Sequence, residues 1–320
     1  MNDTADPVRI YVGCAESEQL AFRILEHSIK RHTDLDVEMR TIDNSLAPEP
    51  TDPRFLPFTN FSYGRVAIPR LAGYQGRAVY MDSDMIVFRD IAELWNTPFK
   101  GAHVLVEQLT PETVNEGKFA AVMLMDCDAL RWDPAEIIAG LGEKYTYDEL
   151  MTLKPLLPGD LLQDRLPLGW NALDHYDENT RLLHYTKVGT QPWMYTGHPL
   201  GYLWTDEIRL MLESGALDPQ DIVEQIERKF IRPSLLIELG LSDAHKGKTL
   251  SPEELARYDK SQGFVIQKQL QERKLARKLA KLEHQKQTDP EGFKRERSKR
   301  RLRKFIRHPV RFLRDPVMRL

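Results

Sequence analysis

The sequence predicts an α/β layer fold with a mainly parallel sheet. Over the first 125 residues, short apolar runs of strand length alternate with segments of helical periodicity, the pattern of strands connected by helices. The run at 120–125 (AAVMLM) is apolar throughout, as expected of a strand covered on both faces. Another run, AVYM, is followed at once by Asp-Ser-Asp. In such sheets ligands bind beyond the carboxyl ends of the strands, so we expect a site at this tripeptide.

The strands and helices of this part follow one another in a regular order. The predicted strands are rich in β-branched, aromatic and other apolar residues: Arg9–Gly13, Asp36–Ile42, Arg77–Met81, Ala102–Glu107 and Ala120–Met125. The predicted helices carry apolar residues at helical spacing: Glu18–Arg31, Arg65–Leu71 and Ile91–Trp95. Leu20, Ile24 and Ile29 form the inner side of the first helix, and Pro69 is expected to break the second. Residues 51–63, rich in proline and phenylalanine, predict a loop.

Beyond residue 206 the pattern turns helical. Helices are expected at Asp206–Ser214 and Asp218–Phe230. After residue 262 a highly charged helix carries leucines on one side, and residues 288–292 indicate a hinge. We therefore expect a catalytic domain at residues 1–245 and a basic helical extension at residues 246–320.

The composition excludes several classes of protein. Hydrophobic residues make up 41% of the 320 residues, which excludes wholesale disorder. Cys14 and Cys127 lack the spacing of a disulfide scaffold, a zinc finger or a redox dithiol, and they fit a reducing compartment. The first residues are polar where a signal peptide would be basic and then apolar, and no apolar run approaches the roughly 20 residues of a membrane span. We expect a cytoplasmic protein, at most peripheral at the inner face of the membrane.

The net charge of −3 hides a strong asymmetry along the chain. Residues 261–320 hold 19 of the 45 Lys and Arg but only 6 of the 48 Asp and Glu, a balance of +13, which leaves −16 for the rest. This asymmetry indicates an anionic partner, and the apolar residues interleaved near the end suit a helix lying on anionic lipid. Nucleic acid would be attracted by the same charge but is not the expected partner. A solvated extension is the alternative.

Asp82 and Asp84 are the strongest candidates for chemistry. In an extended chain, residues two apart point to the same side, so both carboxylates face one spot. Two carboxylates held that close repel each other unless a cation lies between them. A divalent ion there would also bind a diphosphate and neutralise the charge that develops on it as a leaving group. The alternative is a solvated turn whose aspartates cap a helix.

Three ordered blocks resemble a known family. They are IYVGCAESEQLAF near the start, FSYGRVAIPRLAGYQGRAVYMDSDMIVFRDIAELW in the middle, and LPLGWNALD followed by LLHYTKVGTQPW. Over residues 9–204 the chain is thereby similar to family 8 glycosyltransferases of the GT-A fold. The resemblance implies a Rossmann-like mixed sheet with helices on both faces, and sugar transfer that retains the anomeric configuration. The ending KFIRHPVRFLRDP is similar to relatives associated with bacterial surface-polysaccharide synthesis.

The resemblance implies a metal site. Asp82 and Asp84 take the places of the family's metal-binding aspartates. His184 takes the place of the histidine that completes the protein's share of the metal shell, which would bring its ring close to both carboxylates. A buried, hydrogen-bonded histidine without a ligand role is the alternative. Imidazole together with carboxylates suits Mn²⁺ better than Mg²⁺, which prefers oxygen ligands in an octahedron.

The resemblance also implies contacts to a nucleotide-sugar donor. Arg65 lies where the family places a basic residue near the donor sugar and diphosphate, although a charge on a surface helix is the alternative. Gly13 and Cys14 fall in the exit loop of the first strand, which touches the nucleotide base in relatives. Further donor contacts are expected at Ser83, Lys187, Gly189 and Gln191.

Several positions depart from the family's pattern. Ala15 stands where many relatives carry an aspartate for the base, and FAA at 119–121 replaces an asparagine. Gln191 replaces a phosphate-binding lysine, a charge that Lys187 could supply. The segment YDEL at 147–150 weakly resembles the family's Asp-Gln-Asp segment, and its Asp148 is the candidate catalytic carboxylate. These changes lie at positions that recognise the donor sugar in the family. The reaction type is therefore better supported than the identity of the sugar.

The sequence thus predicts a metal-dependent hexosyltransferase that moves a sugar from a UDP-sugar to a glycan or lipid-linked acceptor. Two other classes stay open. A sugar nucleotidyltransferase would need a glycine-rich loop with Arg or Lys after the first strand, which GCAESEQ lacks. A sugar- or lipid-binding protein with a decayed active site is compatible with the departures above, but Asp82, Asp84 and His184 are intact.

Overall fold

The computed structural model describes residues 6–56, 59, 61–108, 119–266, 268–295 and 298–299. Its contacts divide the chain into two units. Unit 1 comprises Met1–Glu49 and Pro57–Lys268, and unit 2 comprises Pro50–Leu56 and Gln269–Leu320. Residues 246–268 therefore lie with unit 1, and the predicted functional division after residue 245 stays a prediction.

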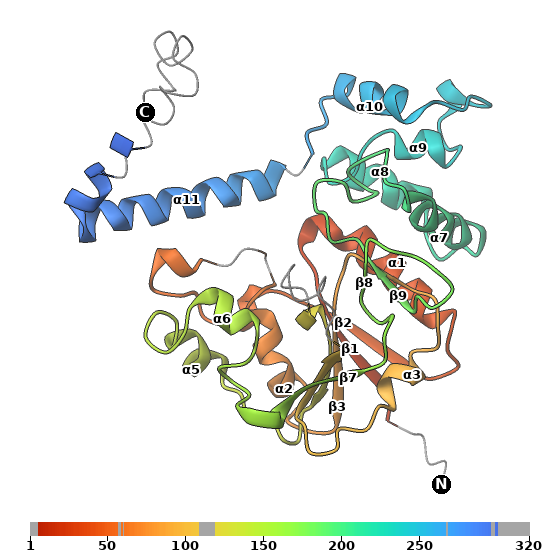
Figure 1. The fold of residues 1–320 in the computed structure, drawn as a ribbon. Helices are drawn as coiled ribbons and strands as arrows, with labels where there is room; N and C mark the ends of the chain where they lie inside the picture. Colours follow the sequence, from red (N-terminus) through yellow and green to blue (C-terminus); the bar gives the residue numbers. More distant parts are fainter. Residues whose placement is uncertain are drawn as a thin grey trace. The chain divides into compact units, whose positions relative to one another are not determined.

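Unit 1 contains a six-stranded mixed sheet. Its strands are β1 (Val8–Gly13), β2 (Val37–Ile42), β3 (Arg77–Asp82), β5 (Val104–Glu107), β6 (Val122–Asp126) and β7 (Leu162–Leu166). They lie in the order β2-β1-β3-β6-β5-β7 (Figure 1). β1 is parallel to β2 and β3, and β5 is parallel to β7, whereas β6 is antiparallel to both of its neighbours. The sheet is mixed, as the resemblance implied, and the parallel pairings of β1 with β2 and β3 and of β5 with β7 agree with the expected mainly parallel arrangement.

A second, smaller sheet extends unit 1. It joins β4 (Met85–Val87), β9 (Leu182–His184) and β8 (Ala172–Leu173) in the order β4-β9-β8. β9 runs antiparallel to β4, and its last residue, His184, is paired with Met85. Because Met85 directly follows Asp84, this register brings His184 beside the Asp-Ser-Asp turn.

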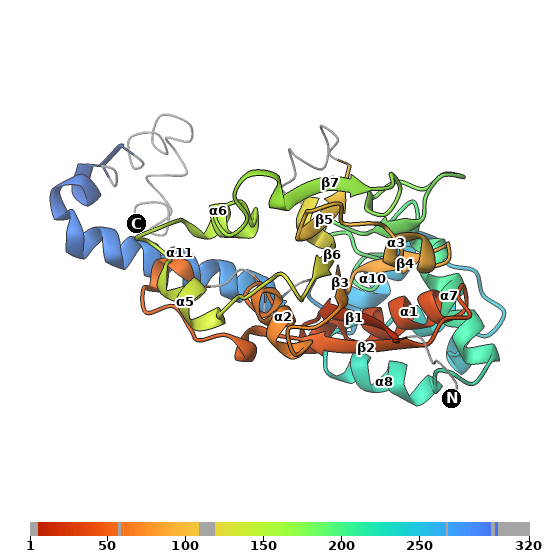
Figure 2. The ribbon, with the colours of Figure 1, turned by 90° about the horizontal axis from the view of Figure 1, so that it is seen from below.

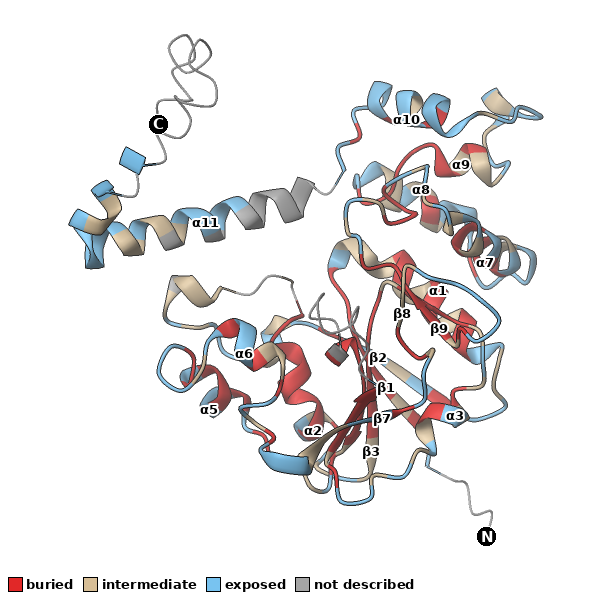
Figure 3. Cartoon of the chain, in the orientation of Figure 1, coloured by how far each residue is buried: buried red, intermediate tan, exposed pale blue. Residues whose placement is uncertain are grey.

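Helix α1 (Gln19–Lys30) is buried on two sides. Ile29 packs into the apolar core that includes β1 and β3. Leu20 and Ile24 pack instead with residues of α7 (Gly201–Glu213) in a second core. All three predicted inner residues of α1 are buried. Figure 3 shows the same concentration of buried residues in the strands and along α1.

Further helices complete the two units. In unit 1 they are α2 (Ile68–Leu71), α3 (Ala92–Trp95), α5 (Pro134–Ala139), α6 (Tyr147–Met151), α8 (Pro219–Glu227), α9 (Leu235–Glu238) and α10 (Pro252–Ser261). The long helix of unit 2 is α11 (Lys268–Thr288), whose first residue is counted with unit 1. Figures 1 and 2 show α1 and α2 on opposite faces of the six-stranded sheet. Over the described residues, no helix is long and apolar enough to cross a membrane.

Pro69 does not break its helix as the sequence suggested. It lies in the first turn of α2. A proline there loses no hydrogen bond, because the first N–H groups of a helix have no partner within the helix. The residue therefore starts the helix rather than interrupting it.

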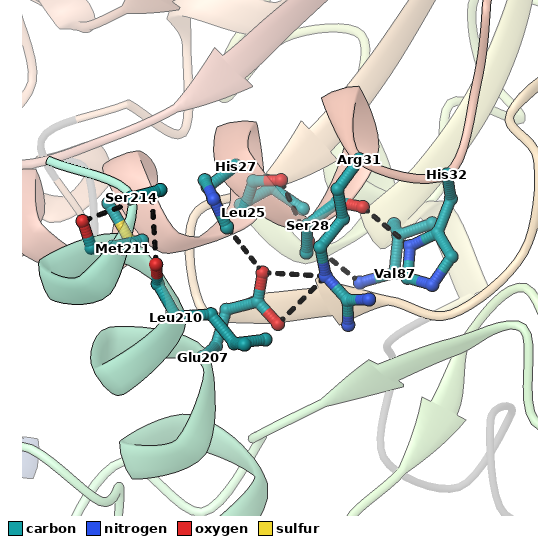
Figure 4. Close-up of polar contacts among 10 residues, drawn as sticks. All are labelled: Leu25, His27, Ser28, Arg31, His32, Val87, Glu207, Leu210, Met211 and Ser214. Atoms are coloured by element: carbon teal, nitrogen blue, oxygen red, sulfur yellow. Dashed lines mark hydrogen bonds and ion pairs between the residues drawn. The ribbon is translucent and has the colours of Figure 1, made fainter. Parts of the chain in front are cut away.

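Polar contacts fix α1 in place (Figure 4). Glu207 on α7 is only 3% exposed, and its Oε1 lies 2.6 Å from Nδ1 of His27. Nε of Arg31 donates to both carboxylate oxygens of Glu207, at 2.9 and 3.1 Å. On the other side of α1, the hydroxyl of Ser28 accepts a hydrogen bond from the Val87 amide at 3.0 Å. The helix is thereby joined to α7 and to β4.

We expect Glu207→Gln to lower the free energy of unfolding by about 1–3 kcal/mol, because the amide group would leave a donor facing the donors of Arg31 and His27. Urea denaturation followed by circular dichroism measures the change. Glu213→Gln is the matched control, since Glu213 is exposed on the same helix, and should stay within about 0.5 kcal/mol of the parent. Equal destabilisation by the two substitutions would contradict the role of the Glu207 contacts.

Candidate functional site

Asp82, Ser83 and Asp84 connect the two sheets. Asp82 ends β3 and Met85 begins β4. The Ser83 amide donates to the carbonyl of Gly13 at 3.1 Å, which ties this turn to the end of β1. Asp82 is 8% exposed and Ser83 is 1% exposed. The two carboxylates are therefore held at the sheet edge where the sequence predicted a site.

His184 lies against both carboxylates. Its Nε2 is 3.2 Å from Oδ1 of Asp84 and 3.9 Å from Oδ2 of Asp82. One potential ligand atom from each of the three residues lies within 4.8 Å of the others. The imidazole is fully buried. The proximity that the resemblance implied is thus present, and the three side chains could hold one metal ion.

Asn171 orients the imidazole. Its Oδ1 lies 2.8 Å from Nδ1 of His184 and accepts the proton on that nitrogen. Nε2 then presents a lone pair to Asp84, and it has no hydrogen-bond partner among the described residues. A lone pair and a carboxylate oxygen repel each other at this distance unless a cation lies between them. The arrangement fits a divalent cation, because metal-binding histidines usually use their second nitrogen in such a hydrogen bond.

Each aspartate also has a neighbour that positions it. Tyr80 donates its hydroxyl proton to Oδ1 of Asp82 at 2.5 Å, and Nε2 of Gln191 donates to Oδ2 of Asp84 at 2.8 Å. Nη2 of Arg65 donates in turn to the Tyr80 hydroxyl at 3.2 Å, and its guanidinium lies 4.8 Å from the centre of the Tyr80 ring. The buried Arg65 therefore contacts the cluster through Tyr80. Sequence reasoning missed Tyr80 and Asn171, because a tyrosine in a strand and an asparagine after a tryptophan resemble ordinary core residues.

The exit of β1 forms a close wall of the site. A side chain at Gly13 would place its Cβ 2.6 Å from the Tyr80 hydroxyl and 2.5 Å from the ring of Phe61. Only glycine therefore fits at this position. Cys14 is buried, and burial raises the pKa of its thiol. Cys14 is accordingly a neutral packing group in this structure.

Glu18 is a residue at the site that sequence reasoning missed. Its Oε2 accepts hydrogen bonds from the Ala15 amide at 3.0 Å and from the Ser83 hydroxyl at 2.9 Å. Burial raises the pKa of Glu18 to about 7, and the neighbouring charges of Asp84 and Asp82 add to the rise. The sequence did contain a signal for the position of Glu18. It lies three positions after Ala15 at the start of a helix, which is the spacing of a capping box.

The remaining predicted residues lie at different distances from the cluster. The Lys187 side chain is 68% exposed, and its Nζ is 3.9 Å from Oδ2 of Asp174. A Cβ at Gly189 would meet no atom within 4 Å, so the backbone there is open. Asp148 is exposed in the first turn of α6, and no contact joins it to the acidic cluster in the part of the chain that the structure describes. The donor and catalytic roles of these residues stay predictions.

Comparison with known proteins identifies the segment that carries the aspartates. Residues 6–131 match the family model described as glycosyl transferase family 8. Over this segment the chain is similar to glycosyl transferase family 8. The family 8 match contains β1, Arg65 and both aspartates, whereas His184 lies beyond it.

Relatives of the family 8 segment share modest identity with it. Protein CDI of Arabidopsis thaliana is 35% identical over 92 residues, which is 28% of this chain and 36% of that protein. Glycosyltransferase 8 domain-containing protein 1 of Bos taurus is 26% identical over 148 residues, which is 46% of this chain and 32% of that protein. The matches span about a third of the length of these curated relatives.

A solved structure shares the fold. The apo structure of WbbM, a bifunctional glycosyltransferase, has a TM-score of 0.50 and 17% identity to this chain. The match covers 71% of this chain and 53% of that one. The mixed sheet and its helices are thus those of the GT-A glycosyltransferase fold that the sequence predicted.

We expect Glu18→Gln to stabilise the metal-free protein increasingly as the pH rises from 5 to 8. Between the ordinary pKa of glutamic acid and about 7, the folded protein binds more protons at Glu18 than the unfolded chain does, so Glu18 lowers the stability as the pH rises. Glutamine removes this penalty and keeps both hydrogen bonds, because one oxygen accepts both.

Thermal denaturation in EDTA at several pH values tests this expectation. Glu136→Gln, at an exposed position on α5, is the control and should show a pH-independent difference from the parent. A difference between Glu18→Gln and the parent that stays constant over this range would contradict the raised pKa.

Proposed function

We propose that the protein is a metal-dependent glycosyltransferase that transfers a hexose from a UDP-sugar to a glycan or lipid-linked acceptor. The observation that carries the proposal is the convergence of Asp82, Asp84 and His184. The cluster lies at the carboxyl end of β3, the sheet edge at which such folds bind ligands, and its aspartates lie within the family 8 match. Similarity to the family over residues 6–131 supports retention of the anomeric configuration.

The side chains of the cluster favour Mn²⁺ over Mg²⁺ as the metal. Two carboxylates and one imidazole form a mixed oxygen and nitrogen set, which Mg²⁺ accepts less readily. When bound, the metal would neutralise the donor's diphosphate and the charge that develops as the nucleotide leaves. The chain's own contribution is to orient the ligands, since Tyr80, Gln191 and Asn171 each hold one of them.

Donor binding is proposed for groups around this cluster. Gly13, Cys14 and Ser83 lie at the β1 exit and the aspartate turn, where a nucleotide would approach the metal. Gln191 would act through Asp84, to which it is hydrogen bonded, in place of the family's lysine. The exposed Lys187 is the candidate cation for the diphosphate, and the open backbone at Gly189 leaves space beside it. Arg65 would support Asp82 through Tyr80. Asp148 remains the candidate catalytic carboxylate from sequence alone.

We expect Asp84→Asn to reduce Mn²⁺ affinity and UDP-sugar hydrolysis by more than about 100-fold, because one charged ligand of three is lost. Asn171→Leu should reduce Mn²⁺ affinity by about 10–100-fold, the usual effect of removing the group that orients a histidine ligand. Isothermal titration with Mn²⁺ and a panel of UDP-sugars with released UDP as readout measure both effects.

Asp164→Asn is the control for the charge change, because Asp164 is exposed on β7. Full donor hydrolysis by Asp84→Asn in EDTA would overturn the metal-dependent mechanism. Metal binding without hydrolysis of any nucleotide sugar would favour the sugar- or lipid-binding alternative, and formation of a nucleotide sugar from a sugar phosphate would favour the nucleotidyltransferase.

A second part of the proposal concerns the basic stretch at residues 261–320. Residues 1–260 carry a net charge of −16 and are repelled by an anionic membrane. Residues 261–320 carry a net charge of +13 and are attracted to it. Residues 300–320 lie outside the described residues, so the membrane role rests on charge and composition. It would place the enzyme peripherally at the inner face of the membrane, beside a lipid-linked acceptor.

We expect removal of residues 291–320 to abolish sedimentation with anionic vesicles at low salt. Attraction to a charged surface decays over a Debye length of about 8 Å at physiological ionic strength, so the parent should also lose binding at high salt. Vesicles of neutral lipid are the control. Equal sedimentation of both proteins with both vesicle types would leave residues 291–320 a solvated extension.

A further inference from the structure

Unit 1 contains a cavity of about 360 Å³ that is lined in part by the segment that follows His184. Its lining includes residues of the segment before α7, residues of α7, α9 and α10, Arg232 before α9, and residues 248–250 before α10. Its volume lies within the range of about 300–1,000 Å³ that is usual for small-molecule sites. Neither the sequence motifs nor the metal cluster account for it.

The lining of the cavity combines aromatic and hydroxyl groups. Tyr195 and Tyr202 line it although they are 38% and 52% exposed. Thr205 lies one helical turn beyond Gly201 on α7, and both line the same wall. A Cβ at Gly201 would be in ordinary van der Waals contact with His198, at 3.6 Å, and with Pro192, at 4.0 Å, and both of these residues line the cavity. Aromatic faces beside hydrogen-bonding groups suit a sugar ring, which has both apolar C–H faces and hydroxyls at its edge.

The arginines of the cavity are already engaged within the protein. Arg232 donates to the carbonyl of Pro192 and to the hydroxyl of Ser234, each at 2.8 Å, and forms an ion pair with Glu238. Arg209 forms an ion pair of 2.6 Å with Asp206. Lys248 is a further cation in the lining. Because two of these three cations, Arg209 and Arg232, are paired with carboxylates, the lining favours a neutral, hydroxyl-rich ligand over a phosphate.

A short chain of contacts connects the cavity with the metal cluster. His198 lines the cavity, and its Nε2 is 3.3 Å from Oδ1 of Asp174. The amide of Asp174 donates to the carbonyl of His184 at 2.9 Å. Pro192, also in the lining, directly follows Gln191, which holds Asp84. A ligand in the cavity would therefore contact the same segment that positions the cluster.

We propose that this cavity binds a neutral saccharide and forms a subsite for the glycan acceptor. The acceptor role rests on the proposed transferase function, whereas saccharide binding itself does not. Tyr195 and Tyr202 provide faces for the sugar rings, and the Thr205 hydroxyl, which donates to backbone carbonyls of its own helix, can accept a hydrogen bond from a sugar hydroxyl. The cavity would thereby bind a part of the acceptor that lies away from the reacting hydroxyl.

Saturation-transfer NMR and calorimetry on the full chain, without donor or metal, test the inference with lactose, maltose and chitobiose as probes. We expect at least one probe to bind. Tyr202→Ala should weaken that binding at least about fivefold, since truncation of a contacting aromatic residue usually costs this much. Gly201→Leu should weaken it as well by filling the cavity, and its Cβ has room, so the fold should persist. Tyr176→Ala, at a tyrosine that is 38% exposed and outside the lining, is the matched control and should bind like the parent.

The possible results separate this inference from the proposed function. Absence of binding by all three probes, or equal loss in Tyr176→Ala and Tyr202→Ala, would overturn the saccharide subsite. Binding of inorganic phosphate that competes with the probes would overturn the choice of a neutral ligand. Intact saccharide binding in a protein that hydrolyses no UDP-sugar would overturn the transferase function and leave the saccharide site in place.

Discussion

The electrostatic repulsion within Asp82, Asp84 and His184 is the constraint on which the rest of the site depends. Two carboxylates and an imidazole lone pair converge within 4.8 Å, with little water to screen them. Such a cluster persists only if the fold holds it rigidly and a cation compensates it. The rigid support is present, because each of the three residues is hydrogen bonded to a side chain of its own.

The two sheets explain how this rigidity is reached. β3 delivers Asp82 at its carboxyl end, and β4 begins directly after Asp84. β9 then pairs with β4 and brings in His184, although it lies far along the sequence. The small sheet therefore fixes the position of the aspartate turn. Helix α1 supports this sheet through the hydrogen bond between Ser28 and Val87. Glu207 on α7 in turn holds α1 in place through its contacts with His27 and Arg31.

The family match covers only part of the residues that form the cluster. The match ends at residue 131, so it includes the two aspartates and the strands that present them. The histidine and its partner Asn171 come from the later segment, which also borders the cavity between α7, α9 and α10.

The sequence by itself determined the α/β class, most strand and helix positions, and the aspartate pair, because these depend on local hydrophobic period and on residues two apart in one chain. It also indicated His184, but only through resemblance to a family. Three findings came from the tertiary structure: the reversed direction of β6, the place of Pro69 in the first turn of α2, and the roles of Tyr80, Asn171 and Glu18. The physical reason is that an antiparallel neighbour, a hydrogen bond across strands and a carboxylate buried beside two others are long-range contacts. Neither the period nor the composition of a local segment records which distant side chain will lie against it.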